Sequence, residues 1–155
     1  MNEASIATVV LLRHGTSPIG AGRDRDRPLG EGMAERLRRG ATALQAANPF
    51  LMIASPARRT LETADAVASV LDIAERRTLD DLYNADGATI LRRIEDAVAE
   101  HPAVLVVGHN PGISAAASEL TGGRVDTSLR PGDAVIVRRD GAVWSFVDRI
   151  AVQAS

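Results

Sequence analysis

The chain has 155 residues, 45% of them hydrophobic, which suits a single domain over residues 1–155 with one buried core. The formal net charge is −2 and the sequence pI is about 5.9, so we expect no nucleic acid among its partners and no binding to anionic membranes. Cysteine and lysine are absent, which excludes thiol catalysis, cysteine-ligated zinc and the Walker A phosphate loop, since that loop needs its lysine.

The N-terminal segment, MNEASIATVVLLRHG, carries an acidic residue, lacks a basic stretch and reaches a charge after a short apolar run. It therefore has the features of neither a signal peptide nor a membrane span. Together with the missing cysteines, this leads us to expect a cytoplasmic protein that is not bound to a membrane.

The first predicted element is a strand over residues 6–12, an apolar run without alternation, as in a strand buried on both faces of a parallel sheet. It ends at Arg13 and His14. Gly15 follows, and a residue without Cβ would let the chain turn sharply there. A helix is predicted next, because apolar residues recur at helical spacing: Met33, Leu37, Ala41 and Leu44.

A second apolar run, residues 50–54, predicts another buried strand. It is followed by Ser55 as a candidate N-cap, Pro56 at the first helical position and Arg58 in the first helical turn. The helix itself is predicted from the spacing of its apolar positions: Ala57, Leu61, Ala64, Ala68 and Leu71.

A third helix is predicted around residues 90–98, and a third buried strand over residues 104–107. The sequence GHNPG follows this strand, with His109 leaving it, Asn110 able to cap, and Pro111 starting another helix. Near the C-terminus, two β-rich runs flank Asp140-Gly141, a pair that favours a tight type I′ hairpin.

The alternation of strands and helices predicts a three-layer α/β/α sandwich, with a mostly parallel central sheet and an antiparallel C-terminal hairpin. In such a sheet, ligands bind outside the carboxyl ends of the strands. Two histidines, two arginines and two helix N-termini would converge there, and arginine forks and free N–H groups suit a phosphate. Neutral imidazole can attack phosphorus without a metal, and neighbouring cations would stabilise the phosphoryl group in flight.

Three segments resemble the histidine phosphatase superfamily, also called the phosphoglycerate mutase-like or RHG family: LLRHGTS, SPARRTLETA and VVGHNPG, in this order. Within it, the short chain, RPLGEGMAERL and the terminal hairpin resemble small phosphohistidine phosphatases of the SixA type. The resemblance implies that His14 is the phosphorylated nucleophile and His109 the second histidine of the phosphate pocket. It also implies that Arg13 and Arg58 bind the phosphoryl oxygens. It implies no cofactor and no metal.

Further residues are expected around this pocket. Thr16, Arg23 and Arg27 are weaker candidates for lining its mouth. Asn110 counts among the substrate-binding candidates, although, like Ser55 and Gly15, its first role is to shape the backbone.

Larger members of the superfamily carry a glutamate that protonates an alkoxide leaving group, in an insertion between the second and last motifs. The corresponding segment here is short and offers only Asp80, Asp81 and Asp86, each of which also suits a turn or a helix start. Because imidazole leaves phosphorus more readily than an alkoxide, the missing acid favours phosphohistidine on a protein partner as substrate. Small phosphomonoesters remain an alternative, and we expect a monomer.

Two other function classes compete with this hypothesis. A binding module for phosphorylated groups would keep the pocket without turnover. A magnesium-dependent phosphatase would use Asp24 and Asp26 as its aspartate pair, but that chemistry needs the aspartates directly after a buried strand, whereas these lie in an arginine-rich loop. A metal site from His14, His101 and His109 is disfavoured because His101 precedes a proline at a helix end and suits a turn.

Overall fold

The structure, a computed structural model, describes residues 6–20 and 22–154, so the first five residues of the N-terminal segment lie outside it. Six strands form one sheet in the order β3-β2-β4-β1-β5-β6. The strands are β1 (Ala7–Arg13), β2 (Leu51–Ala54), β3 (Glu75–Thr78), β4 (Ala103–Gly108), β5 (Asp133–Asp140) and β6 (Val143–Ala151). Strands β1, β4, β2 and β3 run parallel, and β5 and β6 are antiparallel to their neighbours.

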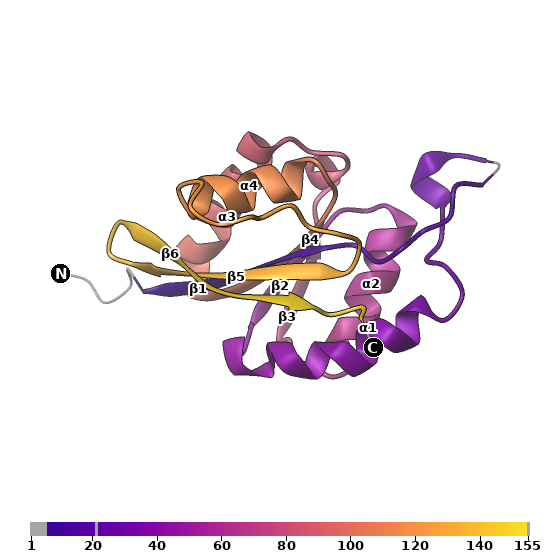
Figure 1. Cartoon of the computed structure of the whole chain (residues 1–155), viewed down its shortest axis with the longest axis horizontal. Helices are drawn as coiled ribbons and strands as arrows, with labels where there is room; N and C mark the ends of the chain where they lie inside the picture. The colour runs from indigo at the N-terminus through magenta and orange to yellow at the C-terminus, as the bar shows by residue number, and fades with distance from the viewer. Residues whose placement is uncertain (1–5, 21, 155) are drawn as a thin grey trace.

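Helices cover both faces of the sheet, in the layers that Figure 1 shows. The α-helices are α1 (Met33–Gly40), α2 (Arg58–Ala68), α3 (Gly87–Glu100) and α4 (Gly112–Leu120). Short 3-10 helices are η2 (Asp24–Asp26), η3 (Ala41–Ala47) and η4 (Asp80–Leu82). The predicted α/β/α sandwich, with its mostly parallel sheet and C-terminal hairpin, is thus confirmed.

The core has two halves because successive side chains of a strand point to opposite faces. In β1, Val9 and Leu11 pack with α3 and α4, through residues such as Ile94. Val10 and Leu12 face the other way and pack with α1, η3 and α2, through residues such as Leu37. Burial on both faces explains why this strand is a continuous apolar run in the sequence.

Three local features differ from the sequence predictions. Strand β3 was not predicted: it is an edge strand of sequence ERRT, largely exposed, so it carries no apolar pattern. The first predicted helix ends at Gly40 and continues as η3. In the hairpin, Asp140 pairs with Val143, and only Gly141 of the two intervening residues has positive φ, at 65°. This φ pattern belongs to a type II′ turn rather than the predicted type I′.

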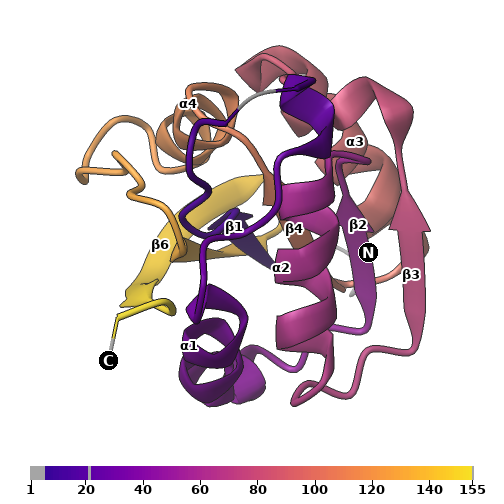
Figure 2. The same cartoon turned by 90° about the vertical axis from the view of Figure 1, so that its right-hand side faces the viewer.

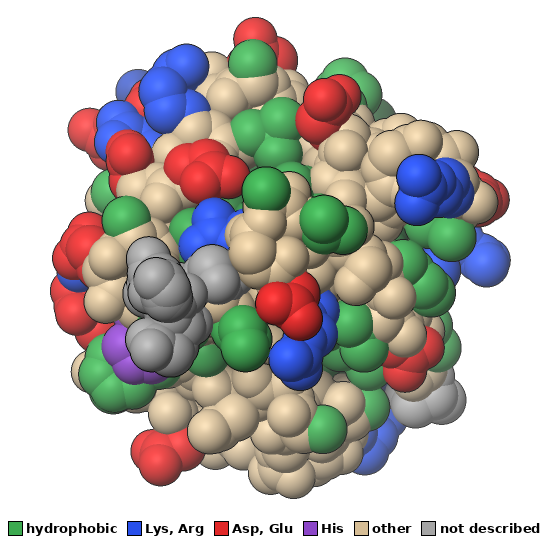
Figure 3. Space-filling view, turned by 90° about the vertical axis from the view of Figure 1, so that its left-hand side faces the viewer, with side chains coloured by type: hydrophobic (Ala, Val, Ile, Leu, Met, Phe, Trp, Pro, Cys, Tyr) green, Lys and Arg blue, Asp and Glu red, His purple; other side chains and the backbone are tan. Residues whose placement is uncertain are grey.

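The surface mixes both signs of charge. On the face shown in Figure 3, basic and acidic side chains are interspersed rather than gathered by sign. None of the helices in residues 6–20 and 22–154 combines the length and the apolar character that crossing a bilayer requires.

Candidate functional site

The carboxyl ends of three parallel strands meet at one edge of the sheet, because β4 lies between β1 and β2. The N–H of His14 donates to the carbonyl of Gly108 (3.1 Å), and the N–H of Ser55 donates to that of Val107 (3.3 Å). The strand registers therefore bring Arg13, His14, Ser55 and His109 to the same place. Figure 2 looks onto this edge, where the loop between β1 and α1 crosses in front of the strands.

His14 is 8% exposed, and its contacts define which ring nitrogen carries the proton. Nδ1 lies 2.7 Å from the carbonyl oxygen of Gly15. A carbonyl can only accept, so Nδ1–H donates and Nε2 keeps its lone pair. The glycine that follows the histidine thus orients the ring through its backbone.

His109 lies beside His14, with ring centroids 5.2 Å apart. Its Nδ1 accepts from Nη2 of Arg59 (3.3 Å), since a guanidinium only donates. Its Nε2–H then donates to Oγ of Ser55, 2.7 Å away. Ser55 is fully buried and also accepts the N–H of Ala57 (3.1 Å). It orients His109 rather than capping α2, whose N-cap is Ala57.

The arginine between the two histidines is Arg59. Its Nε donates toward Nε2 of His14 at 3.4 Å, and its side chain is buried. Arg58, which the sequence analysis placed at the phosphate, points elsewhere: its side chain is 58% exposed and pairs with Glu62 at 2.9 Å. The prediction for Arg58 is therefore corrected to Arg59. We call Arg13, His14, Arg59 and His109 the cluster.

The sequence analysis gave Arg58 from the resemblance and from its place in the first helical turn, and Arg59 lies in the same turn. The predicted stripe included Leu61 and Ala68, which are only half-buried. The observed stripe instead contains Arg59, Thr63 and Val67, at helical spacing. A stripe drawn through these positions would have pointed Arg59 inward.

Arg13 joins the cluster from the end of β1. Its Nη1 donates to the carbonyl of Leu129 (3.0 Å). Its Nε is buried and has no hydrogen-bond partner among the described residues. An unpaired buried donor on a cation beside His14 suits an anion. Burial lowers the pKa of Arg13, with the charge of Asp133 opposing this shift.

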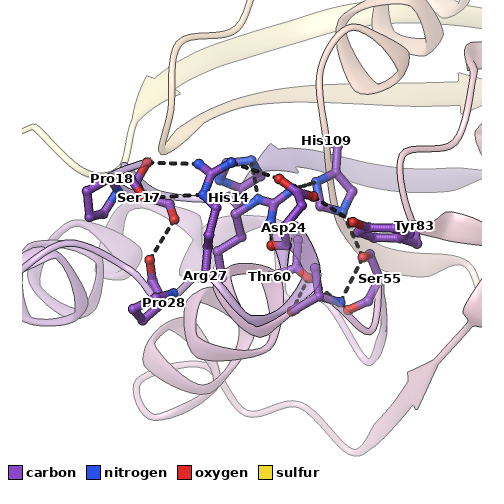
Figure 4. A network of polar contacts seen from close by, with 12 residues as sticks. His14, Ser17, Pro18, Asp24, Arg27, Pro28, Ser55, Thr60, Tyr83 and His109 are labelled. Carbon is purple, nitrogen blue, oxygen red and sulfur yellow. Dashed lines mark hydrogen bonds and ion pairs between the residues drawn. The ribbon is translucent and has the colours of Figure 1, made fainter. Parts of the chain in front are cut away.

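Arg27, one of the predicted residues at the mouth, is bonded to the segment that follows His14 and to Asp24. It donates to the carbonyls of Ser17 (3.0 Å) and Pro18 (3.2 Å) and to Oδ1 of Asp24 (2.8 Å), as Figure 4 shows. Its positive charge also acts on the pKa of His14. Arg23 is largely exposed and pairs with Asp26 at 3.2 Å.

Thr16, Asn110 and Gly15 have structural contacts. Both the backbone N–H and the hydroxyl of Thr16 are bonded to the Gln153 side chain, at 2.7 Å each. Asn110 donates to the carbonyl of Leu129 (2.9 Å) and accepts from Ser114 in α4. Gly15 has no positive φ; a Cβ there would instead crowd the side chains of Gln153 and Leu37.

Both cluster histidines are held neutral. Burial is the main cause that lowers the pKa of His14 to about 4, and the charges of Arg59, Arg13 and Arg27 add to it, against the hydrogen bond to Gly15. Burial also lowers the pKa of His109 to about 3, helped by the neighbouring His14 and Arg59. A neutral ring with a free lone pair is the form in which histidine acts as a nucleophile.

The three candidate proton donors do not contact the cluster. Asp81 binds Arg93 through several hydrogen bonds, which lower its pKa. Asp86 caps α3 by accepting from the N–H of Thr89 (2.9 Å), and this bond lowers its pKa too. Asp80 lies in η4, and none of the hydrogen bonds of the His14 and His109 side chains goes to it. The residue that this segment does bring to the site is Tyr83, whose ring lies edge-on to His109 with centroids 5.7 Å apart.

Asp24, one of the two aspartates of the magnesium hypothesis, is also at the site. Its Oδ2 accepts from Arg59 (3.1 Å) and from the Tyr83 hydroxyl (2.6 Å). No group of three or more carboxylate, histidine or cysteine side chains within the described ranges is arranged to hold a metal ion. The sequence analysis did not predict the contacts of Asp24 with Arg59 and Tyr83, because Asp24 lies in the connection between β1 and α1, where sequence spacing does not define contacts.

Comparison with known proteins gives a family and a fold. The model of the histidine phosphatase superfamily (branch 1) matches residues 9–102. A comparison with curated proteins found no match. Among solved structures, the protein histidine phosphatase SixA complexed with tungstate is 22% identical, with a TM-score of 0.83 over 94% of this chain and 97% of that chain.

Two further structures are similar. A putative phosphohistidine phosphatase SixA from Agrobacterium tumefaciens is 25% identical, with a TM-score of 0.81 over 92% of this chain and 96% of that one. Another putative one, from Nakamurella multipartitia, is 25% identical, with a TM-score of 0.78 over 96% and 97%. The family model confirms the family that the sequence predicted, and these likenesses confirm the fold.

Proposed function

The chain belongs to the histidine phosphatase superfamily and is a phosphatase of that type; we propose that it works through a phosphohistidine on His14 and acts on phosphohistidine in a partner protein. The observation that carries the proposal is the orientation of His14. Its unprotonated Nε2 faces Arg59, beside His109, at the edge where three strands end.

In the proposed first step, Nε2 of His14 attacks the phosphorus atom of the substrate. A bond forms between Nε2 and phosphorus, and the bond between phosphorus and the leaving nitrogen breaks. Its electron pair stays on that nitrogen, so a substrate histidine with a proton on its other ring nitrogen leaves as neutral imidazole. Phosphoryl oxygens are stronger acceptors than imidazole nitrogens, so they would replace the ring nitrogens as partners of Arg59. Nε of Arg13, which has no partner among the described residues, would donate to the same group. These cations stabilise the charge that spreads over the oxygens during transfer.

In the second step, a water oxygen attacks the phosphorus of phosphohistidine 14 and the Nε2–phosphorus bond breaks. Inorganic phosphate leaves and the histidine returns to its neutral form. The hydrogen bond from Nδ1 to the Gly15 carbonyl holds the ring in one orientation through both steps. No redox partner takes part in this sequence.

The surroundings of the cluster support a leaving group that needs no strong acid. Asp81 and Asp86 have lowered pKa values and no contact with the histidines. The pKa of Asp24 is lowered to about 2, chiefly by the hydrogen bond from Tyr83. Imidazole leaves phosphorus more readily than an alkoxide does, so phosphohistidine fits better than a phosphomonoester. The SixA proteins named above share this fold.

The substrate proposal is tested by comparing turnover of a protein phosphorylated on histidine with turnover of small phosphomonoesters, using wild type, His14→Ala and His101→Asn. His101 is a suitable control because it is a histidine outside the cluster. It lies at the end of α3 and stacks on Phe50, with ring centroids 3.8 Å apart. We expect faster turnover of phosphohistidine, lost in His14→Ala and kept in His101→Asn. Preference for phosphomonoesters would contradict the substrate, and phosphate binding without any hydrolysis would instead indicate a binding module. The cytoplasmic location and the monomeric state stay predictions.

A further inference from the structure

Asp24 accepts hydrogen bonds from both terminal nitrogens of the Arg59 guanidinium. Nη1 of Arg59 donates to the backbone carbonyl of Asp24 (2.8 Å), and Nη2 donates to its Oδ2 (3.1 Å). The remaining contacts of the guanidinium, from Nε and Nη2, go to His14 and His109. Asp24 therefore holds the two terminal nitrogens of Arg59, while the edge of the guanidinium that carries Nε and Nη2 faces the histidines.

Asp24 is itself fixed by two further side chains, Tyr83 and Arg27. Its Oδ2 also accepts from the hydroxyl of Tyr83 (2.6 Å), which lies just after η4. Its Oδ1 accepts from Nη1 of Arg27 (2.8 Å). Figure 4 shows Asp24 between Arg27 and Tyr83, next to the two histidines. These bonds keep its carboxylate in one place, although 45% of the side chain is exposed.

Because Arg59 is buried, its charge depends on the ion pair with Asp24. The side chain of Arg59 is 5% exposed, and within the described part of the chain Asp24 is the only carboxylate that forms an ion pair with it. A buried guanidinium without such a partner keeps an uncompensated charge and adopts whichever rotamer reaches water. The pKa of Asp24 is about 2, so the carboxylate stays ionised and acts as an acceptor rather than a proton donor.

We propose that Asp24 is a positioning residue for phosphoryl transfer: by holding Nη1 and Nη2 of Arg59, it keeps the side of that guanidinium directed at the phosphoryl group on His14. This inference rests on the proposed function. Asp24 acts through Arg59 and does not touch the reacting atoms. The opposite role would be that of a competing anion, which a phosphoryl group must displace from Arg59.

Asp24→Asn tests the proposal, with Asp26→Asn as the matched control. Both changes remove one negative charge from η2, but among the described residues Asp26 forms its ion pair with the exposed Arg23 alone. In rapid-quench experiments, we expect Asp24→Asn to slow formation of the phosphoenzyme about 10- to 100-fold with little change in KM, as for a misaligned catalytic group. Asp26→Asn should stay within about two-fold of wild type because its ion pair is exposed.

A second readout does not depend on turnover. The Nε–H resonance of Arg59, assigned by its loss in Arg59→Lys, should exchange slowly with water in wild type and Asp26→Asn, and much faster in Asp24→Asn. If a thermal melt shows that Asp24→Asn is not folded, Tyr83→Phe takes its place, because it removes one hydrogen bond to the Asp24 carboxylate. It should change both readouts in the same direction, by less.

The outcomes separate this inference from the proposed function. If wild type forms no phosphoenzyme, the proposed function fails and the Nε–H exchange alone decides the role of Asp24. An unchanged Nε–H exchange in Asp24→Asn overturns the inference, whatever the turnover. Equal or faster phosphoenzyme formation in Asp24→Asn, with tighter binding of inorganic phosphate, also overturns it and makes Asp24 a competing anion.

Discussion

Nε of Arg59 lies 3.4 Å from Nε2 of His14, which places a permanent cation against the ring nitrogen that carries the lone pair. The same cation opposes protonation of that nitrogen and is ready to bind phosphoryl oxygens. Arg58, one position earlier in the sequence, lies on the outside of α2. Substituting Arg58 and Arg59 one at a time therefore tests which of the two binds the phosphoryl group.

Arg59→Ala should lower the rate of phosphate release about 100- to 1000-fold, as loss of a donor to the transition state does. Arg58→Ala should stay within about two-fold of wild type, because it breaks only a solvent-exposed ion pair with Glu62. Steady-state kinetics with one substrate, together with a thermal melt of each variant, measures both. A large loss in Arg58→Ala with little loss in Arg59→Ala would contradict the corrected assignment.

The cluster histidines should titrate far below the ordinary histidine value. We expect the ring C–H resonances of His14 to keep their neutral shifts from pH 8 down to about 5, because its pKa is lowered to about 4. His109, with its pKa lowered to about 3, should behave likewise. A proton NMR titration, assigned with His14→Gln and His109→Gln, gives the midpoints. A midpoint near 6.5 for either ring would show that burial and the arginines do not control it.

Stability should decrease on the acid side of neutrality. In the folded protein His109 binds a proton only near pH 3, whereas in the unfolded chain it does so near pH 6.5. Between these values the unfolded state binds more protons, so the free energy of unfolding is highest above about pH 6.5 and falls as the pH drops toward 3. Urea unfolding across this range measures the slope. His109→Gln should make the slope shallower by the share of His109, while His14, whose pKa is also lowered, keeps the other share. An equally steep slope in that variant would argue against this origin.

Gly40 is expected to tolerate no side chain. It lies at the junction of α1 and η3 with helical φ, but a Cβ there would overlap the backbone carbonyl of Val152. Gly40→Ala should therefore lower the free energy of unfolding by about 3 kcal/mol, from overpacking. Gly20→Ala is the control, since nothing lies within 4 Å of its Cβ position. Equal stability of the two variants would show that the Val152 segment moves away at little cost.

Elements with a buried face could be predicted from the sequence. The apolar runs that became β1, β2 and β4 are buried on both faces, so their composition alone marks them. Strand β3 could not be predicted, because an exposed edge strand is held by backbone bonds to β2 and needs no apolar side chains. The order of the strands in the sheet could not be predicted from the sequence pattern either.

The site was predictable where a residue directly follows a strand. His14 and His109 come immediately after β1 and β4, and parallel strands bring these positions together. Arg59 depended on the rotational phase of α2, which a weak stripe of alanines did not define. Asp24 and Tyr83 could not be predicted, since their contact joins two loops 59 positions apart through side-chain bonds.

The most direct test of the proposed mechanism is to trap the phosphoenzyme. The protein is mixed with a labelled phosphoryl donor, quenched in alkali and digested, and the labelled peptide is identified. We predict an alkali-stable, acid-labile phosphate on the peptide that contains His14, absent from His14→Ala and present in His101→Asn. Turnover without any labelled intermediate, or with label on another residue, would contradict His14 as the nucleophile.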